Sequence, residues 1–97
     1  MAAYVVSEVE ILDEEKANIY RSLASASIEH YGGRYIVRGG AIELIEGERD
    51  AERRLVIVEF PSMQRAHEWY RSPEYAEALR VRAGALERTL TFVEGAA

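Results

Sequence analysis

The period of the hydrophobic pattern changes along the chain, and each change marks the boundary of a predicted element. The segment Tyr4–Ile11 is rich in β-branched and aromatic residues, which predicts a strand. Behind the N-cap residue Asp13, apolar residues recur every three or four positions, which predicts a helix over about residues 14–29. Gly32 and Gly33 are expected to end this helix.

Two further strands are predicted at Arg34–Arg38 and Arg54–Phe60, and the segment between them admits two interpretations. Gly39-Gly40 forms either a two-residue hairpin turn or a bulge in one long, bent strand that continues through Ala41–Glu46. We favour the bulge, because the polar segment Gly47–Arg53 makes a better turn. That turn would let Ala41–Glu46 pair with the strand that follows.

The last third of the chain predicts a helix in two pieces and a final strand. Ser62 is expected to cap the first piece and Ser72 the second, in which Pro73 takes the first helical position. Thr89–Val93 is the final strand. The order β-α-β-β-α-β predicts a single ferredoxin-like α+β domain over residues 1–97, with two helices on one face of a four-stranded antiparallel sheet.

The strand Arg54–Phe60 predicts that the other face of the sheet is covered too. Its central residues Leu55–Val58 are all apolar, so apolar side chains point to both faces. The helices of one chain cover one face only, and a bare apolar sheet face usually marks an interface. We therefore expect a second copy of the chain to pack on this face and form a homodimer.

Composition excludes several classes of partner. The net charge is −5, with 17 acidic residues against 12 basic ones, so nucleic acid is not an expected partner. The absence of cysteine removes disulfides and thiolate catalysis, and it suits the reducing cytoplasm in which we expect the protein. No apolar run is long enough to span a bilayer and the N-terminus does not resemble a signal peptide, so no membrane association is expected.

Three blocks of sequence carry a family resemblance: Tyr31–Gly40, Val58–Ser62 and Trp69–Tyr75, the last followed by Arg82. In these blocks the chain resembles the bacterial domain-of-unknown-function family 1330, within the dimeric α/β-barrel superfamily. The resemblance implies a homodimer whose two sheets form a barrel-like core. It implies no activity, because the superfamily includes cofactor-independent quinol monooxygenases, muconolactone isomerase-like enzymes, haem-binding proteins and regulatory ligand-binding modules.

Arg38 and Glu59 are the candidate reactive residues. A strand arginine that faces a barrel interior needs a carboxylate, a carbonyl or a bound anion. It would either bind a ligand carboxylate or enolate oxygen or pair internally with Glu59 or Glu46, and we favour the internal pair. Glu59 ends an apolar strand, where a raised pKa would suit a general base. A pair of Glu59 with Arg38 or Arg82 is again the favoured interpretation.

Aromatic residues gather around the predicted helix break at Ser72-Pro73. They are Trp69, Tyr70 and Tyr75, with Tyr31 from the glycine block and Arg82 two helical turns beyond Tyr75. One interpretation is a flat apolar pocket with phenol hydroxyls directed at a planar ligand. The other, which we favour, is packing in the core and at the dimer interface.

Metal and cofactor sites find no support in the sequence. His30 and His67 are the only histidines, and they lack the spacing of a metal-ligand pair. His30 is expected at the C-terminal end of its helix and His67 at the surface. We expect neither a metal nor a cofactor.

Three hypotheses about function remain. The first is a homodimer with a small-molecule pocket between sheet and helices and no assigned chemistry, its ligand-binding residues being Tyr31, Arg38, Glu59, Trp69, Tyr70, Tyr75 and Arg82. The second is a cofactor-independent monooxygenase- or isomerase-like enzyme acting on a small oxygenated or aromatic metabolite. In that enzyme Glu59 transfers a proton and Arg38 stabilises an oxyanion. The third is a purely structural dimer.

Overall fold

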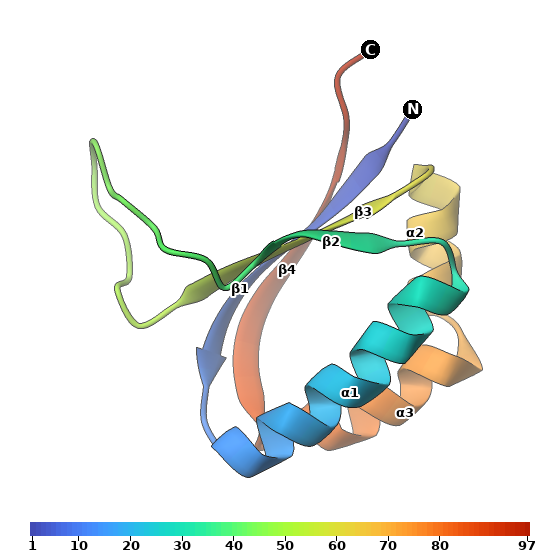
Figure 1. Cartoon of the computed structure of the whole chain (residues 1–97), viewed down its shortest axis with the longest axis horizontal. Coiled ribbons are helices and arrows are strands. Elements are labelled where there is room, and N and C mark those ends of the chain that lie inside the picture. Colours follow the sequence, from blue (N-terminus) through green and yellow to red (C-terminus); the bar gives the residue numbers. More distant parts are fainter.

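The computed structural model describes residues 1–97, and Figure 1 shows a curved sheet with its helices on one side. The elements in chain order are β1 (Ala3–Ile11), α1 (Glu14–His30), β2 (Arg34–Arg38), β3 (Arg54–Phe60), α2 (Met63–Tyr70), α3 (Pro73–Arg82) and β4 (Leu86–Glu94). All pairings in the sheet are antiparallel, in the order β2-β3-β1-β4. The ferredoxin-like α+β prediction is therefore confirmed, with the second helix divided into α2 and α3.

The helix boundaries follow from side-chain caps that the sequence predicted. Asp13 accepts a hydrogen bond from the backbone N–H of Lys16 at 3.1 Å, which satisfies a free donor in the first turn of α1. Ser72 accepts in the same way from the N–H of Tyr75 at 3.0 Å. The chain therefore turns between α2 and α3 without leaving buried backbone donors unpaired. None of the three helices is long and apolar enough to cross a bilayer.

The hydrophobic core lies between the helices and one face of the sheet, here called the helix face. The strand register places Val5 opposite Val58, and both side chains are buried on this face. Helix α1 adds Tyr20 and Ile28, and α2 adds Trp69, whose side chain is almost completely buried. Burial of these side chains supplies most of the driving force for folding.

The opposite face of the sheet, here called the open face, is not covered by this chain. Tyr4 and Val6 of β1 lie on it, opposite Glu59 and Ile57 of β3, and all four side chains are partly exposed. At the same end of the face, Val93 of β4 is 48% exposed. The prediction that β3 is apolar on both faces is confirmed by this arrangement.

The segment that follows β2 departs from the predicted structure, because Ala41–Glu46 does not form a strand. The N–H of Gly39 donates to the carbonyl of Leu55 at 2.9 Å, and the chain then leaves the sheet. Gly39 has a φ of 69°, a left-handed conformation that turns the backbone away from β3. The irregularity in the β2–β3 pairing lies between Tyr35 and Val37, not at the glycines. Residues 39–53, here called the arm, project from the sheet (Figure 1).

Candidate ligand-binding site

A cleft of about 120 Å³ opens between α1 and the helix face of the sheet. Most of its lining is apolar and comes from β1, β3, β4 and α1. The apolar lining residues include Val5, Val9, Ile11, Tyr20, Ala24, Ile28, Tyr35, Val56, Val58, Trp69, Leu86 and Leu90. A cavity with this lining removes apolar ligand surface from water, which favours binding of an apolar body.

Arg88 brings a charge into the apolar wall of this cleft. It lies on β4 between Leu86 and Leu90, in the row of side chains that faces the helices. Its Nη1 donates to the hydroxyl of Tyr20 at 2.6 Å, and its Nη2 donates to the hydroxyl of Tyr75 at 2.6 Å. The two phenol oxygens are also hydrogen-bonded to each other at 2.6 Å. No carboxylate forms an ion pair with Arg88.

The protonation states around Arg88 follow from burial. Burial raises the pKa of the Tyr20 phenol well above its usual range, so Tyr20 is neutral at pH 7. Desolvation acts to lower the pKa of the Arg88 guanidinium, but its contacts with Tyr20 and Tyr75 outweigh this and the net shift is upward. Arg88 therefore remains a cation whose partners in the protein are phenol hydroxyls.

Three further arginines line the more exposed part of the cleft: Arg21, Arg38 and Arg54. Arg38 donates to the hydroxyl of Ser25 at 2.8 Å and lies 4.0 Å from the centre of the Tyr35 ring. Arg21 lies 3.4 Å from Glu14, outside the cleft. Asp, Glu and His are all missing from the lining, so the cleft is positive in a chain whose net charge is −5.

Ser7 adds a polar atom to the same wall. Its side chain is buried on the helix face opposite Val56, and its Oγ has no hydrogen-bond partner. A buried hydroxyl without a partner costs free energy relative to its hydrated state. An acceptor or donor on a bound molecule would recover that cost.

The seven residues predicted to bind a ligand do not all meet. Arg38 and Trp69 line the cleft, and Tyr75 reaches Arg88 through its hydroxyl. The other four lie outside the cleft lining; they are Tyr31, Glu59, Tyr70 and Arg82. The hydroxyl of Tyr31 donates to Glu74 at 2.6 Å, and the Tyr70 side chain is exposed beside Phe92. Of the seven, the structure brings Arg38 and Trp69 to the cleft directly and Tyr75 only through its contact with Arg88.

The predicted pairing of Arg38 with Glu59 is wrong, because the two side chains lie on opposite faces of the sheet. The register places Arg38 opposite Val56 on the helix face, whereas Glu59 lies opposite Tyr4 on the open face. Glu59 accepts from Arg34 at 2.7 Å and from the Tyr4 hydroxyl at 3.2 Å, and the contact with Arg34 lowers the pKa of Glu59. The alternative predicted pairs, Arg38 with Glu46 and Glu59 with Arg82, are also not observed.

Two of the aromatic residues at the helix break, Trp69 and Tyr75, pack in the core, as one part of the favoured interpretation predicted, whereas Tyr70 is exposed. Trp69 lies 4.2 Å from Tyr75 between ring centres, and 5.3 Å from Phe60. Its indole N–H donates to the hydroxyl of Ser27 at 3.0 Å. Trp69 is thus fixed in the core while one part of its surface forms the wall of the cleft.

Sequence reasoning missed Arg88 and Tyr20. The final strand was predicted to begin at Thr89, but β4 begins at Leu86, and this places Arg88 inside the strand. Every second residue of this strand points to the same face, and the row is Leu86, Arg88, Leu90 and Phe92. An arginine in this otherwise apolar row was the available signal for a charged group at the site. Tyr20 is one of the recurring apolar positions in the helix predicted over about residues 14–29, and this pattern does not indicate that its hydroxyl contacts Arg88.

Groups of three or more His, Cys, Asp or Glu side chains that could hold a metal ion are absent.

Comparison with protein-family models gives a match over residues 2–96 to the domain of unknown function DUF1330. The chain belongs to family 1330. Comparison with curated proteins gives no match. Among solved structures, a protein of unknown function from Rhodopseudomonas palustris is 20% identical, with a TM-score of 0.79 over 99% of this chain and 83% of that one.

Two other solved structures broaden the comparison for this family 1330 member. SnoaB from Streptomyces nogalater, a cofactor-independent oxygenase, is 7% identical with a TM-score of 0.71, covering 99% of this chain and 94% of SnoaB. A dimeric protein of unknown function with a ferredoxin-like fold from Bacteroides fragilis is 14% identical with a TM-score of 0.57, covering 97% and 96% of the two chains. At these identities the similarity shows a shared fold.

Proposed function

We propose that this family 1330 domain binds a small organic anion, such as an aromatic or short-chain carboxylate, in the cleft between α1 and the sheet. The observation that carries the proposal is Arg88. Its guanidinium lies in an apolar wall, is held by two phenol hydroxyls, and has no carboxylate partner. An anion in the cleft would complete its coordination.

The free-energy argument starts from the cost of placing a charge there. Removing an ionised group from water costs several kcal/mol, and neutral hydrogen-bond partners recover only part of it. Arginine has five N–H donors in a planar fork that matches a carboxylate. Tyr20 and Tyr75 each take one donor of Arg88, which leaves other donors for a ligand. Arg21, Arg38 and Arg54 add attraction for the same charge.

The dimensions of the cleft limit the size of the ligand. Pockets for drug-sized molecules have volumes of about 300–1,000 Å³. The cleft here, at about 120 Å³, is smaller. It suits a single ring or a short chain with one acidic group, with Trp69 and the β-branched residues of the sheet contacting the apolar body.

Binding is favoured over the enzymatic alternative by the position of Glu59. The proposed general base would have to reach the ligand, but Glu59 is on the open face and pairs with Arg34. The cleft lining contains no carboxylate or imidazole to take its place. The likeness to SnoaB concerns the fold, so it does not by itself favour oxygenase activity.

The second part of the proposal is that the domain acts as a homodimer. The open face carries partly exposed apolar side chains, among them Val6, Ile57 and Val93, which a second sheet would cover. The Bacteroides fragilis protein, which has a similar fold, is described as dimeric. Covering the open face of both copies would leave the two clefts accessible, because they lie on the helix side.

A thermal-shift series with paired ligands tests the anion proposal. Benzoate and hexanoate should raise the melting temperature, because a ligand that binds the folded state stabilises it, while benzamide and hexanamide should not. Arg88→Met should abolish the difference within each pair. Arg80→Met is the matched control, since Arg80 is an exposed arginine of α3 that pairs with Glu77. Equal shifts from acid and amide, or unchanged acid shifts in Arg88→Met, would contradict the proposal.

A further inference from the structure

The arm is the most exposed apolar segment of the molecule. Ile42, Leu44 and Ile45 are 43%, 52% and 78% exposed. Exposing three large aliphatic side chains within four positions is unfavourable for a chain that remains alone in water. Connections of this length without secondary structure are uncommon in compact domains and usually have a function.

The backbone of the arm is also unpaired. Between Gly40 and Glu48 no backbone N–H or C=O takes part in a backbone hydrogen bond. Apolar and acidic residues alternate over part of this stretch, from Ile42 to Leu44. An exposed segment with free backbone groups and apolar side chains is suited to contact another chain, as in recognition by strand addition.

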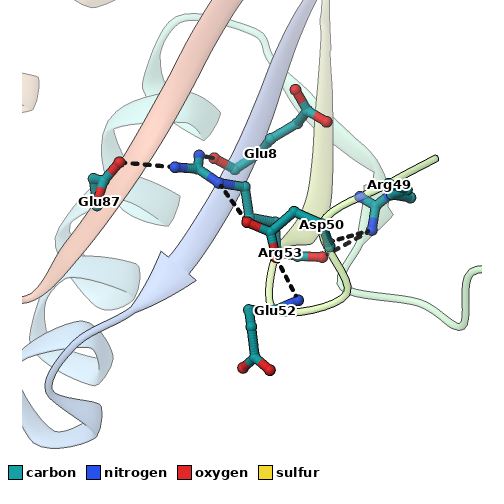
Figure 2. A network of polar contacts seen from close by, with 6 residues as sticks. All are labelled: Glu8, Arg49, Asp50, Glu52, Arg53 and Glu87. Carbon is teal, nitrogen blue, oxygen red and sulfur yellow. Dashed lines mark hydrogen bonds and ion pairs between the residues drawn. The ribbon is translucent and has the colours of Figure 1, made fainter.

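The base of the arm is nevertheless fixed to the sheet. Figure 2 shows the guanidinium of Arg53 lying across β1, where it donates to the carbonyl of Glu8 at 3.0 Å and pairs with Glu87 of β4 at 2.7 Å. Arg49 in turn donates to the carbonyls of Asp50 and Arg53 at 3.3 and 3.0 Å. The end of the arm at residues 49–53 is therefore fixed before any partner binds, which lowers the entropic cost of ordering the rest of the arm on binding.

This anchor places the base of the arm at the border of the open face. Glu8 lies opposite Leu55 in the register, and Glu87 lies opposite Glu10, so both belong to the row of residues on the open face. A partner that covers the open face therefore approaches the arm as well.

Charge at this border also suits a second copy. Ile42, Leu44 and Ala51 form a hollow of about 350 Å³ together with Arg49, Arg53 and Arg54. On the open face, Glu8 and Glu10 form no ion pair within the chain. One copy thus offers a hollow with apolar side chains and two arginines that form no ion pair, Arg49 and Arg54, and the other offers an apolar face with free carboxylates.

We propose that the arm is a dimerisation element that contacts the second copy of the chain across the border of the open face. This inference rests on the homodimer of the proposed function and adds the segment that stabilises it. In a two-fold dimer each arm would contact the partner once, so one apolar segment contributes to the interface twice. Stable interfaces bury about 800 Å² on each partner, which an arm added to the sheet face helps to reach.

The test is the dimer dissociation constant of arm variants, measured by sedimentation over a dilution series. The double variant Leu44→Glu/Ile45→Glu should raise the dissociation constant at least about tenfold, because it places two charges in the contact. Ile19→Glu is the matched control, since Ile19 is 50% exposed on α1 and lies away from the open face. A second variant, with residues 41–46 replaced by glycine and serine at the same length, tests the arm without added charge.

The possible outcomes distinguish a failure of the arm proposal from a failure of the dimer proposal. If both arm variants keep the wild-type dissociation constant while Ile57→Glu dissociates the dimer, the arm proposal is wrong and the sheet-face dimer stands. A wild type that is monomeric at micromolar concentration overturns both. In support of the arm, amide hydrogens of residues 41–46 should exchange more slowly above the dissociation constant than below it, in wild type but not in the arm variants.

Discussion

At the scale of single residues, the contacts of Arg88 couple it to two tyrosines. Tyr75 is completely buried, and its hydroxyl is one of the acceptors that Arg88 has within the protein. Tyr20 is the other, and it also shares a hydrogen bond with Tyr75. The three side chains therefore form one polar unit inside the core, and a change in one should depend on the presence of the others.

A double-mutant cycle tests this coupling. Tyr75→Phe removes an acceptor from a partly buried cation and should lower the free energy of unfolding by about 1–3 kcal/mol. In an Arg88→Met background the same change should cost clearly less, because no charge is left without a partner. Urea unfolding of the four proteins gives the coupling energy. Equal costs of Tyr75→Phe in both backgrounds would show that the unit does not exist.

Gly33 is a position where the packing leaves no space for a side chain. A Cβ there would lie 2.7 Å from an atom of the Phe60 ring and 2.8 Å from one of Ile28. Gly33→Ala should therefore lower the free energy of unfolding by about 1–3 kcal/mol through overpacking. Gly40→Ala is the control, since a Cβ at Gly40 meets nothing within 4 Å, and its stability should be unchanged or slightly higher. Similar stabilities of the two variants would contradict the packing described here.

The pKa of Glu59 in the folded state makes the stability of the protein depend on pH. Arg34 and Tyr4 lower the pKa of Glu59 in the folded state. The resulting stabilisation is present above the unfolded pKa of about 4.3, and it is lost as the pH falls through the folded value. Glu59→Gln should therefore lower the melting temperature at neutral pH and flatten its decrease in acid.

Melting curves from neutral pH to about pH 3 measure this effect. Glu48→Gln on the arm, where Glu48 forms no ion pair, is the control. A Glu59→Gln profile parallel to that of wild type would show that the contact with Arg34 does not stabilise the fold.

At the scale of elements, the sequence predicted the helix caps and the strands, because local chemistry determines both. Asp13 and Ser72 were identified as caps because their side chains satisfy backbone donors of the residues just after them. The four strands were found because alternation and β-branched residues mark them. The arm was mispredicted because its alternation matches that of a strand, while the turn at Gly39 depends on a backbone angle that the pattern does not specify.

The candidate site was less predictable, because it depends on which strand residues face the helices. Because β4 was predicted to begin at Thr89 and not at Leu86, Arg88 was not recognised as a strand residue. The bulge between Tyr35 and Val37 reverses which residues of β2 face the helices. Arg38 and Glu59 were expected to meet because both are charged residues on neighbouring strands. Only the register shows that the sheet separates them.

At the scale of the whole molecule, the sheet divides the two proposed functions between its faces. The helix face holds the cationic cleft with Arg88, and the open face, bordered by the arm, is the proposed contact with a second copy. Ligand binding and dimerisation would therefore vary independently in variants of either face. Ile57→Glu should dissociate the dimer without removing the acid-specific thermal shift.

The most direct test of the cationic cleft is isothermal titration calorimetry with whichever of benzoate and hexanoate binds more tightly. Wild type and Arg80→Met should bind it with the same dissociation constant, and Arg88→Met should bind at least about tenfold more weakly while remaining folded. Since Arg88 carries a partly buried charge without a carboxylate partner, its replacement by an apolar residue should leave stability unchanged or raise it. Binding of the acid to Arg88→Met with the wild-type affinity would contradict the account.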